Sequence, residues 1–591
     1  MARKEDLFRT PKLVIDTQMK PVCLVCLFAI LINPVALARK NPVPLLNQPL
    51  VPGFSVPGRS DFTLTVRGAG FAKNATVYWN GSPRTTTFKS AVRLDATIPA
   101  ADVAQPGTAT VTVVNPPPGG GASNPVFFSI SLPSASIGWL NKNIVTGNEY
   151  SVSIATADFN DDGNLDVALL DAFPSNGKTV EIYLGNGDAT FQEGAGYLAG
   201  DNSIFTGDVN GDGEVDLVTT DSAGAFEVLL GNGDGTFRPP LKTSANPGGF
   251  VGALGDFNGD GHLDMVIHYE QSGVPSTFQV FFGNGDGTFQ APTTYGDGEN
   301  LFPVSIALGD YNSDAIIDLA VVNNAPTNPR IQIYLGTLCC GFQPPTSFDA
   351  GLTPVRVVTA DFNNDTHLDL AVANLEGSGF GSTVSILLGN GDGTFQPPMI
   401  FPVGPTALRL RAGVFTGDSK PDLAVVSATG LSVLAGNGDG TFKNALSFPA
   451  GFIPSAIATG DVNNDGRLDF IVANDTTFLA FSVLTQSTAA LSDTNLTFGG
   501  VGVGTSSHPR NVRLTNIGSS DLSLASIIIG GTDAGDFSQQ TTCGATVASG
   551  ASCTITVTFT PTGLGARHGQ LALTDSASSK PQVITLAGRG K

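Results

Sequence analysis

The chain is poor in basic residues and in histidine. Its 591 residues include 30 Lys and Arg against 51 Asp and Glu, which gives a formal net charge of -21, and only 5 His. Nucleic-acid binding requires clusters of Lys and Arg that neutralise phosphates, so this balance argues against such a partner and favours cations as small ligands. No HExxH or GxSxG motif occurs. The histidines form no ligand-like cluster: His262, His268, His367, His508 and His568.

The sequence also lacks the long runs of Ala, Glu, Lys and Leu that are typical of helix bundles. It is instead rich in glycine and proline, with 72 and 38 residues, and its apolar segments are short and contain Val, Thr and Phe. These features predict an all-β protein with few helices. A chain of 591 residues exceeds one ordinary core, so we expect several domains, or a repeat array with flanking modules.

Long hydrophobic runs are absent except near the N-terminus. The stretch MKPVCLVCLFAILINPVALARK contains a positive residue, an apolar run from Val22 to Ile32 and a small-residue cleavage site ending at Ala38. We therefore expect residues 1–38 to be a secretory signal peptide, with translation starting at Met19, and residues 39–45 to be a linker. The apolar run is too short for a good membrane span, and no other candidate follows it. The prediction is an exported protein, secreted or held at the cell surface.

Cysteine is scarce as well, with 6 residues. Two of them lie in the expected signal peptide, and four remain in the mature chain: Cys339, Cys340, Cys543 and Cys553. An even count in an exported protein is typical of disulfides. Cys543 and Cys553 lie ten residues apart in a β-rich segment and are the better pair, whereas the adjacent Cys339 and Cys340 are harder to place. Neither pair has the spacing of a zinc site.

What the chain does contain is an acidic motif that recurs at intervals of 47 to 54 residues. A clear copy is TGDVNGDGEVDLVTT at residues 206–220, in which Asp or Asn stands at positions 1, 3, 5 and 9 of a loop between two apolar runs. The loops begin at residues 158, 208, 256, 310, 361, 414 and 461. Self-similarity of this period is typical of propellers and other repeat architectures.

A glycine-rich motif, GNGDGTF, recurs in phase with the acidic loops. Each unit then holds four short apolar runs, which is the composition of a propeller blade. The seventh unit lacks its own GNGDGTF turn, but Trp139 precedes Asp158 by 19 residues, the distance that separates Phe237 from Asp256. We therefore predict a seven-bladed β-propeller over residues 132–486 in which SIGWLNKN is the outer strand of the last blade, since closure removes exposed edges.

The spacing of the acidic residues predicts a calcium site, because calcium takes six to eight hard oxygen ligands and such a loop can converge them on one ion. We expect about five or six loops to bind calcium. The loop from Val414 lacks its first carboxylate and is expected to bind none, while Ala315 and Thr366 stand where two other loops should have glycine. The predicted ligands are Asp158, Asn160, Asp162, Asp166, Asp208, Asn210, Asp212, Asp216, Asp256, Asn258, Asp260, Asp264, Asp310, Asn312, Asp314, Asp318, Asp361, Asn363, Asp365, Asp369, Asp461, Asn463, Asp465 and Asp469.

Other interpretations of these letters are weaker. Asp, Asn and Gly are common turn formers, which would explain one acidic loop but not seven in register. An EF-hand has its bidentate acid at position 12 and flanking helices, whereas the last Asp here is at position 9 and the flanks resemble strands. A dockerin pairs its loops at much shorter spacing. The aspartates of the glycine-rich turns are interpreted first as hairpin residues: Asp234, Asp286, Asp392 and Asp439.

A catalytic interpretation remains as the alternative. Paired carboxylates could support a polysaccharide lyase or hydrolase, but each repeated Asp is already assigned to a metal loop or a turn. Glu270 and Glu376, which lie outside the repeated motifs in connections between strands, are the best candidates for such chemistry. We expect no enzyme, because no catalytic constellation is left over.

Two flanking segments have their own patterns. Residues 46–131 alternate Phe62, Leu64 and Val66, and their succession of GxGF, WNG, TIPA and VVNPPPGG resembles the IPT/TIG immunoglobulin-like family. Residues 487–591, with LTFGGVGVGTSS, CTITVTFTP and LAGRG, resemble the ASPM-SPD-2-Hydin or choice-of-anchor D class of immunoglobulin-like domains. The resemblances imply two β-sandwich modules that act as spacers or adapters.

The repeat region itself resembles the FG-GAP/VCBS family, which includes the integrin α-subunit propellers. This resemblance covers about 350 residues and rests on the seven loops and the GNGDGTF turns. It implies calcium in the first hairpin of each blade, on one face, and ligands on the loops of the opposite face. We therefore expect a non-catalytic, calcium-binding scaffold for adhesion, whose partner is an extracellular protein or polysaccharide.

Overall fold

The computed structural model describes residues 41–591 apart from the short segments 47–49, 53, 56, 106, 131–137, 145–148, 173–176, 222–224, 245–248, 270–276, 296–302, 325–329, 338–340, 376–381, 405, 417–419, 428–429, 449, 451–453, 465–466, 477–480, 488, 494, 517–520, 549 and 577–580. The expected signal peptide lies outside the described residues, as do Cys339 and Cys340. The predicted all-β fold is confirmed. Among the described residues the helices are two short 3-10 turns, η1 (Ala100–Val103) and η2 (Ala534–Asp536), and no helix is long and apolar enough to cross a membrane.

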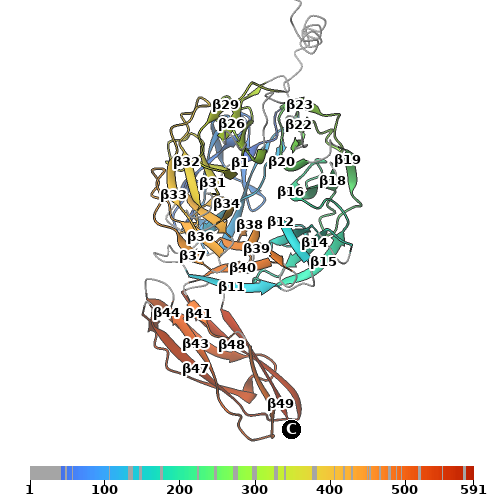
Figure 1. Ribbon diagram of the computed structural model, residues 1–591. Coiled ribbons are helices and arrows are strands. Elements are labelled where there is room, and N and C mark those ends of the chain that lie inside the picture. Colours follow the sequence, from blue (N-terminus) through green and yellow to red (C-terminus); the bar gives the residue numbers. More distant parts are fainter. Residues whose placement is uncertain are drawn as a thin grey trace, which may run out of the picture. The chain divides into compact units, whose positions relative to one another are not determined.

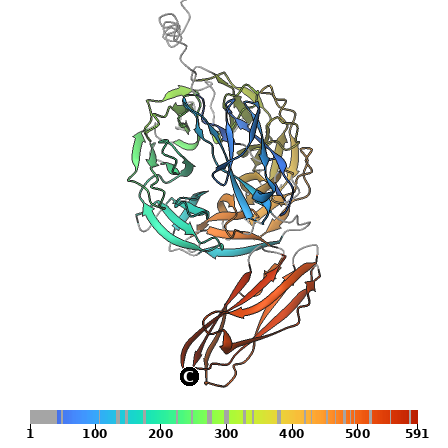
Figure 2. The ribbon, with the colours of Figure 1, turned by 180° about the vertical axis from the view of Figure 1, so that it is seen from behind.

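The N-terminal module is a β-sandwich of two sheets (Figure 2, blue). One sheet has the order β1-β3-β7-β6 and the other β2-β10-β8-β4-β5, with β9 beside β8. Phe62, Trp79 and Phe128 pack together between the sheets. The strands are β1 (Leu45–Leu46), β2 (Phe54–Ser55), β3 (Phe62–Ala69), β4 (Thr76–Trp79), β5 (Ser82–Pro83), β6 (Thr86–Ser90), β7 (Arg93–Ile98), β8 (Gly107–Asn115), β9 (Gly121–Ala122) and β10 (Val126–Ile130).

The linker predicted over residues 39–45 differs from the structure from Asn41 onward. The Asn41 N–H donates to the Pro118 carbonyl over 2.7 Å, and Leu45 pairs with Ala69 at the start of the β1–β3 ladder. These bonds satisfy backbone groups that a packed segment cannot leave to solvent. Residues 41–46 therefore belong to the sandwich. This segment is too short to show a hydrophobic periodicity, so the sequence did not predict its pairing.

Within the described residues, the central part of the chain forms five separate four-stranded antiparallel sheets and one eight-stranded sheet, in which two further sets of four strands are joined by the pairing of β12 with β39. We call each set of four strands a blade (Figure 1). Each inner strand contacts the next, and β12 contacts β38, so the blades form a closed ring. In order from inner to outer strand, the blades are β12 (Glu149–Ala157), β13 (Asp166–Asp171), β14 (Val180–Gly185) and β15 (Phe191–Tyr197); β16 (Ser203–Gly207), β17 (Asp216–Thr220), β18 (Ala225–Leu229) and β19 (Leu241–Ser244); β20 (Gly249–Gly255), β21 (Asp264–Tyr269), β22 (Thr277–Phe281) and β23 (Thr293–Tyr295); β24 (Pro303–Gly309), β25 (Asp318–Asn323), β26 (Arg330–Tyr334) and β29 (Thr346–Phe348); β30 (Pro354–Ala360), β31 (Asp369–Asn374), β32 (Thr383–Leu387) and β33 (Met399–Pro402); β34 (Ala407–Gly413), β35 (Asp422–Ser427), β36 (Gly430–Leu434) and β37 (Leu446–Phe448); β38 (Pro454–Gly460), β39 (Asp469–Thr476), β40 (Phe481–Ser487) and β11 (Gly138–Ile144). A small hairpin, β27 (Gly336–Thr337) and β28 (Gly341–Phe342), belongs to the fourth blade.

The ring closes where the sequence predicts. Strand β11, which contains Trp139, pairs antiparallel with β40 from Gly138 opposite Ser487 to Ile144 opposite Phe481. The first strand of the repeat region, β11, therefore completes the blade formed by its last three strands, β38, β39 and β40. Because this pairing covers the outer edge of β40, the seventh blade has four strands like the others.

The C-terminal module is a second sandwich, with sheets in the orders β41-β43-β47-β45 and β42-β49-β48-β44-β46. Alternate residues of β47 are buried, among them Ile555, Val557 and Phe559, as the sequence pattern predicts. Cys543 and Cys553 form a disulfide. The strands are β41 (Ala489–Leu491), β42 (Asn495–Val501), β43 (Arg510–Asn516), β44 (Leu522–Gly530), β45 (Phe537–Thr541), β46 (Thr546–Val547), β47 (Ser552–Phe559), β48 (Gly565–Asp575) and β49 (Gln582–Gly590).

Candidate metal loops

The acidic loops join the inner strand of each blade to its second strand. In the second blade, the Asp208 carboxylate at loop position 1 accepts the N–H groups of Gly211 and Gly213 over 2.7 and 2.9 Å. The Asn210 amide at position 3 donates to Asp212 at position 5 over 2.8 Å. The same pattern, with small shifts, recurs in the loops that begin at Asp158, Asp256, Asp310 and Asp361. The predicted ligands at positions 1, 3 and 5 are thus brought together within one tight turn.

Position 9 has a separate structural role. Asp216 begins the second strand and is fully buried, and its two carboxylate oxygens accept the N–H of Val209 at loop position 2 and the N–H of Gly231 just beyond the third strand, over 2.9 and 2.8 Å. One side chain therefore connects the loop to the far end of its own blade. The equivalent residue makes the same pair of bonds in every blade: Asp166, Asp264, Asp318, Asp369, Asp422 and Asp469.

The sixth blade separates this role from metal binding. Its loop begins with Val414 in place of an aspartate, yet Asp422 still accepts the N–H groups of Phe415 and Gly436, and additionally that of Thr416, over 2.7, 2.9 and 2.7 Å. The position 9 aspartate therefore shapes the blade even where the first carboxylate is missing. In the second blade each oxygen of Asp216 accepts a single N–H, so each keeps a second lone pair with which it could also bind an ion.

Two loops adopt the left-handed turn without glycine. Gly213 has φ 94° at position 6, and Ala315 and Thr366 hold the same conformation with φ 69° and 83°. A β-branched residue is strained there, at a cost of about 1–3 kcal/mol. The N–H of Thr366 donates to Asp361 over 3.0 Å, as glycine does elsewhere, so the carboxylate at position 1 keeps the turn in place.

The position 9 carboxylates are fully buried close to the other aspartates of their loops, and this changes their acidity. Burial is the main cause that raises the pKa of Asp166 and Asp216 to about 6 and of Asp264 to about 8, and the charges of neighbouring loop aspartates raise it further. The pKa values of Asp318 and Asp369 are raised for the same reasons, to about 8 and about 7. Such high pKa values mean that, without metal, several of these carboxyls take up a proton near neutral pH, whereas a bound cation would favour their ionised form.

The glycine-rich turns hold neighbouring blades together. Asp234 accepts the hydroxyl and the N–H of Thr236 within its own turn, and these two bonds lower the pKa of Asp234. Equivalent bonds are made by Asp286, Asp392 and Asp439. The turn then reaches the previous blade, where the Gly235 N–H donates to the carbonyl of Phe159 over 2.8 Å and Phe237 packs edge-on against the Phe159 ring. These aspartates are turn residues, as the sequence indicates.

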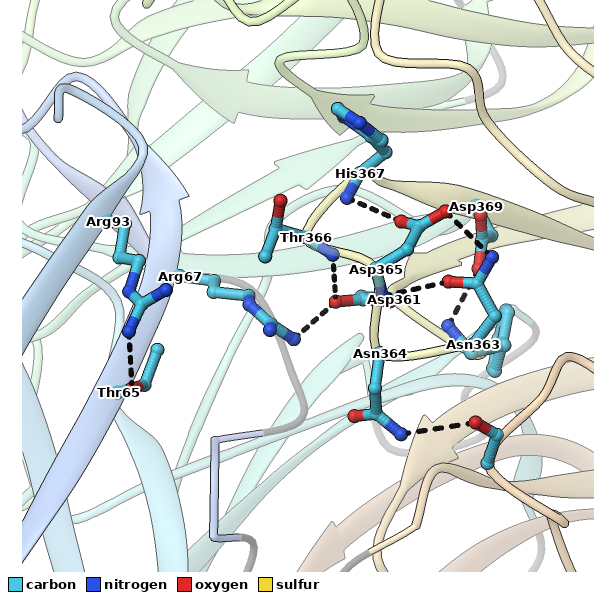
Figure 3. A network of polar contacts seen from close by, with 12 residues as sticks. Thr65, Arg67, Arg93, Asp361, Asn363, Asn364, Asp365, Thr366, His367 and Asp369 are labelled. Atoms are coloured by element: carbon cyan, nitrogen blue, oxygen red, sulfur yellow. Dashed lines mark hydrogen bonds and ion pairs between the residues drawn. The ribbon is translucent and has the colours of Figure 1, made fainter.

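The N-terminal module contacts two of the acidic loops, and Figure 3 shows the contact with the fifth loop. Arg67 of β3 forms an ion pair with Asp361 at position 1 of the fifth loop, and their side chains are only 10% and 2% exposed. In the third loop, Asp256 accepts the N–H of Val43 over 2.9 Å. Neither contact was predicted from the sequence, because Arg67 stands at a polar position of the alternating pattern of β3 and gives no sign there of its partner.

A cavity of about 370 Å³ lies between the same module and the ring. Val43, Leu45 and Thr112 line one side of it. The other side contains the first residues of four acidic loops: Asp158, Asp208, Asp256 and Asp461. The face that carries the predicted metal ligands is thus partly covered by the N-terminal module.

Some predicted site residues lie outside the described residues, namely Asp465, Glu270 and Glu376. Within the described part of the chain, no group of three or more His, Cys, Asp or Glu side chains is gathered closely enough to hold a metal ion as it stands. Each loop whose ligands are intact also supplies one asparagine amide, such as Asn210. The oxygen-only donor set fits calcium by its chemistry.

Comparison with family models identifies three kinds of module. FG-GAP-like repeat models match residues 158–219, 208–267, 310–372 and 415–472, an IPT/TIG domain model matches 49–130, and a Cep192 domain 4 model matches 489–591. The chain therefore carries FG-GAP-like repeats between an IPT/TIG domain and a Cep192-type immunoglobulin-like domain, which confirms the resemblances seen in the motifs.

Integrin alpha-PS3 of Drosophila melanogaster is 28% identical over 188 residues, and the match covers 27% of this chain and 16% of the integrin. Among solved structures, an auxiliary nutrient binding protein of Bacteroides ovatus is 11% identical with a TM-score of 0.34, covering 75% of this chain and 98% of that one. An Agrocybe aegerita lectin that recognises non-reducing terminal N-acetylglucosamine is 17% identical with a TM-score of 0.39, covering 63% and 96%.

The raised pKa values predict how the metal-free protein responds to pH. The folded carboxylates have pKa values of about 6 to 8 against 3.8 for the ordinary group, so between about pH 4 and pH 8 the folded chain binds more protons than the unfolded chain. The contribution of these carboxyls to the free energy of unfolding is then fully present below about pH 4, and it is lost as the pH rises through their folded-state pKa values. We expect the melting temperature of metal-stripped protein to fall from pH 5 to pH 8 at constant ionic strength. A rise over this range would contradict the assignment.

The Arg67 ion pair predicts a local effect. Arg67→Ala leaves the buried Asp361 carboxylate without its counter-charge, a change that typically costs about 3–5 kcal/mol. In metal-free protein we expect hydrogen exchange of the amides between residues 361 and 369 to accelerate, as measured by mass spectrometry. Lys73→Ala, at an exposed position of the same module, is the matched control. Equal protection in both variants would show that the pair contributes nothing to holding the loop.

Proposed function

We propose that this chain is an exported, non-catalytic binding scaffold whose ring of blades is ordered by calcium. The observation that carries the proposal is the set of hydrogen bonds that the repeated aspartates accept. In the first five blades the carboxylates at positions 1, 5 and 9 accept backbone N–H groups of their own loop and blade, and in the sixth and seventh blades the position 9 carboxylate does so. The repeated acids thus serve the shape of the blades. The partial similarity to an integrin α chain, together with the FG-GAP-like repeats, supports a ligand-binding role.

Calcium is the cation that these loops would take. The ligands are carboxylate and amide oxygens, which are hard donors, and no sulfur or imidazole lies among positions 1, 3, 5 and 9 of the loops. Calcium, when bound, would neutralise the crowded carboxylates. Asp208, Asn210 and Asp212 would hold the ion in the second blade, together with a lone pair of Asp216. The Val414 loop lacks a position 1 carboxylate and would take none.

Ligand binding is assigned to the ring face opposite the acidic loops. Arg67 and Val43 contact the acidic loops of the fifth and third blades, so the N-terminal module already occupies part of that face. The opposite face carries the connections from second to third strands, such as residues 172–179, 324–330 and 375–382, most of which lie outside the described residues. Their sequences differ from blade to blade, which suits selective contact with an extracellular protein or polysaccharide.

Calcium binding is the first test. Addition of calcium to metal-stripped protein is expected to raise the melting temperature saturably, because a ligand that binds only the folded state stabilises it. Asp208→Asn/Asp212→Asn should remove one ion from the count obtained by equilibrium dialysis and elemental analysis. Asp286→Asn, in a glycine-rich turn, is the matched control and should leave the count unchanged. An unchanged melting temperature would contradict the calcium assignment.

Ligand binding is the second test. Calcium-loaded protein is expected to bind a restricted set of glycans or extracellular proteins on arrays, and replacement of residues 325–329 by Gly and Ser should weaken that binding at least tenfold. The control replaces the exposed Asp439 of an outer turn with Asn. Release of reducing or unsaturated sugar ends from a polysaccharide panel would instead support the lyase or hydrolase alternative, and an array with no ligand would overturn the scaffold proposal.

A further inference from the structure

The inner strands of the ring are almost free of charge, with one local exception. Their sequences consist of Gly, Ala, Ser, Thr, Pro, Tyr, Phe and aliphatic residues, except for Glu149 at the start of β12 and three arginines. The arginines are Arg356 on β30 and Arg409 and Arg411 on β34. In a chain of net charge -21, all positive charge of the innermost layer is thus concentrated in two adjacent blades.

The register brings these arginines to one place. Arg356 and Arg409 each precede the first residue of their acidic loop, at 361 and 414, by five positions, and the two strands contact each other. Arg356 lies opposite Ala373 and Arg409 opposite Val426 on the second strands of their blades. Arg411 lies on the same side of β34 as Arg409, since side chains alternate along a strand and the intervening Leu410 is buried in the core between the blades.

The printed contacts of two of these guanidinium groups end on neutral backbone oxygens. Arg356 donates through Nη1 to the carbonyls of Val304 and Val355, and Arg411 donates through Nη1 to the carbonyl of Leu410 over 3.3 Å. A guanidinium has five N–H donors, so these bonds leave donors to spare. Among the described residues, neither Arg356 nor Arg411 forms an ion pair with a carboxylate.

The three charges act on one another. Burial lowers the pKa of Arg356 to about 10 and of Arg409 to about 9, and the next cause in each case is the charge of another of these arginines. Burial also lowers the pKa of Arg411. Its residue surface is nevertheless exposed, so water reaches the cluster at Arg411. The pKa values of Arg356 and Arg409 stay above neutral pH, so the cluster carries concentrated positive charge that water can reach.

We propose that Arg356, Arg409 and Arg411 form an oxyanion-binding site inside the ring, which takes a sulfate, a phosphate or a carboxylate. A planar guanidinium binds such groups through paired N–H donors, and one anion between adjacent inner strands would relieve the repulsion of the cluster. The anion could be a free inorganic ion or an acidic group of a polysaccharide. This site lies on other strands and other residues than the acidic loops, and it needs no calcium.

The test is a titration of the full mature chain with sulfate at constant ionic strength, from zero to 20 mM. The wild type should show a saturable rise in melting temperature of several degrees, because the anion binds only the folded ring. Arg356→Gln/Arg411→Gln should lose this rise, and should melt at or above the wild-type temperature without sulfate, because two repelling charges are gone. Arg238→Gln, on an exposed outer turn, should respond like the wild type. An equal sulfate response in the double variant would overturn the proposal.

A crystal soak provides a readout that does not depend on a variant folding. Selenate has the shape and charge of sulfate, and an anomalous difference peak is expected within hydrogen-bond distance of Arg356 and Arg411. No peak there at saturating selenate would contradict the site even if the double variant proved unstable. Calorimetry with sulfate and with a uronic acid trisaccharide then separates the two sources, since tighter binding of the trisaccharide identifies a polysaccharide carboxylate and tighter binding of sulfate a free ion.

Discussion

The ring depends on one buried carboxylate in each blade. The aspartate that begins every second strand accepts one N–H from the acidic loop and another from just beyond the third strand, as Asp216 does with Val209 and Gly231. Loss of the acceptor would leave two buried N–H donors unpaired, at a cost of about 1–3 kcal/mol each. The position of the loop and the exit of the third strand are thereby set by the same side chain.

Contacts between blades follow from that geometry. Because the aspartate fixes where the third strand ends, it also fixes where the glycine-rich turn begins, and this turn bonds to the loop of the previous blade. Gly235 reaches Phe159 in this way, and Gly393 reaches Tyr311, with distances of 2.8 and 2.9 Å. The two motifs that recur in the sequence are thus two halves of one contact repeated around the ring. Their common period is a consequence of that contact.

The repeats made most of this architecture predictable from the sequence. The spacing from Trp139 to Asp158 predicted the closing strand β11, and the in-phase motifs predicted four strands for each unit. The docking of the N-terminal module was not predictable, because Arg67 and Asp361 belong to different modules and neither residue departs from the pattern of its own. The second role of Asp216 also escaped prediction, since a residue that suits metal binding by type and spacing gives no sign in the sequence of the backbone groups it holds.

The pairing of β11 with β40 has a mechanical consequence. Gly138, where the chain enters the ring from the N-terminal module, lies opposite Ser487, where it leaves for the C-terminal module. Tension applied through the two flanking modules would therefore load the end of this ladder and peel it open one residue pair after another, instead of shearing all the pairs at once. The seam that closes the ring is then its weakest point under load, and a stretched chain would lose the seventh blade first.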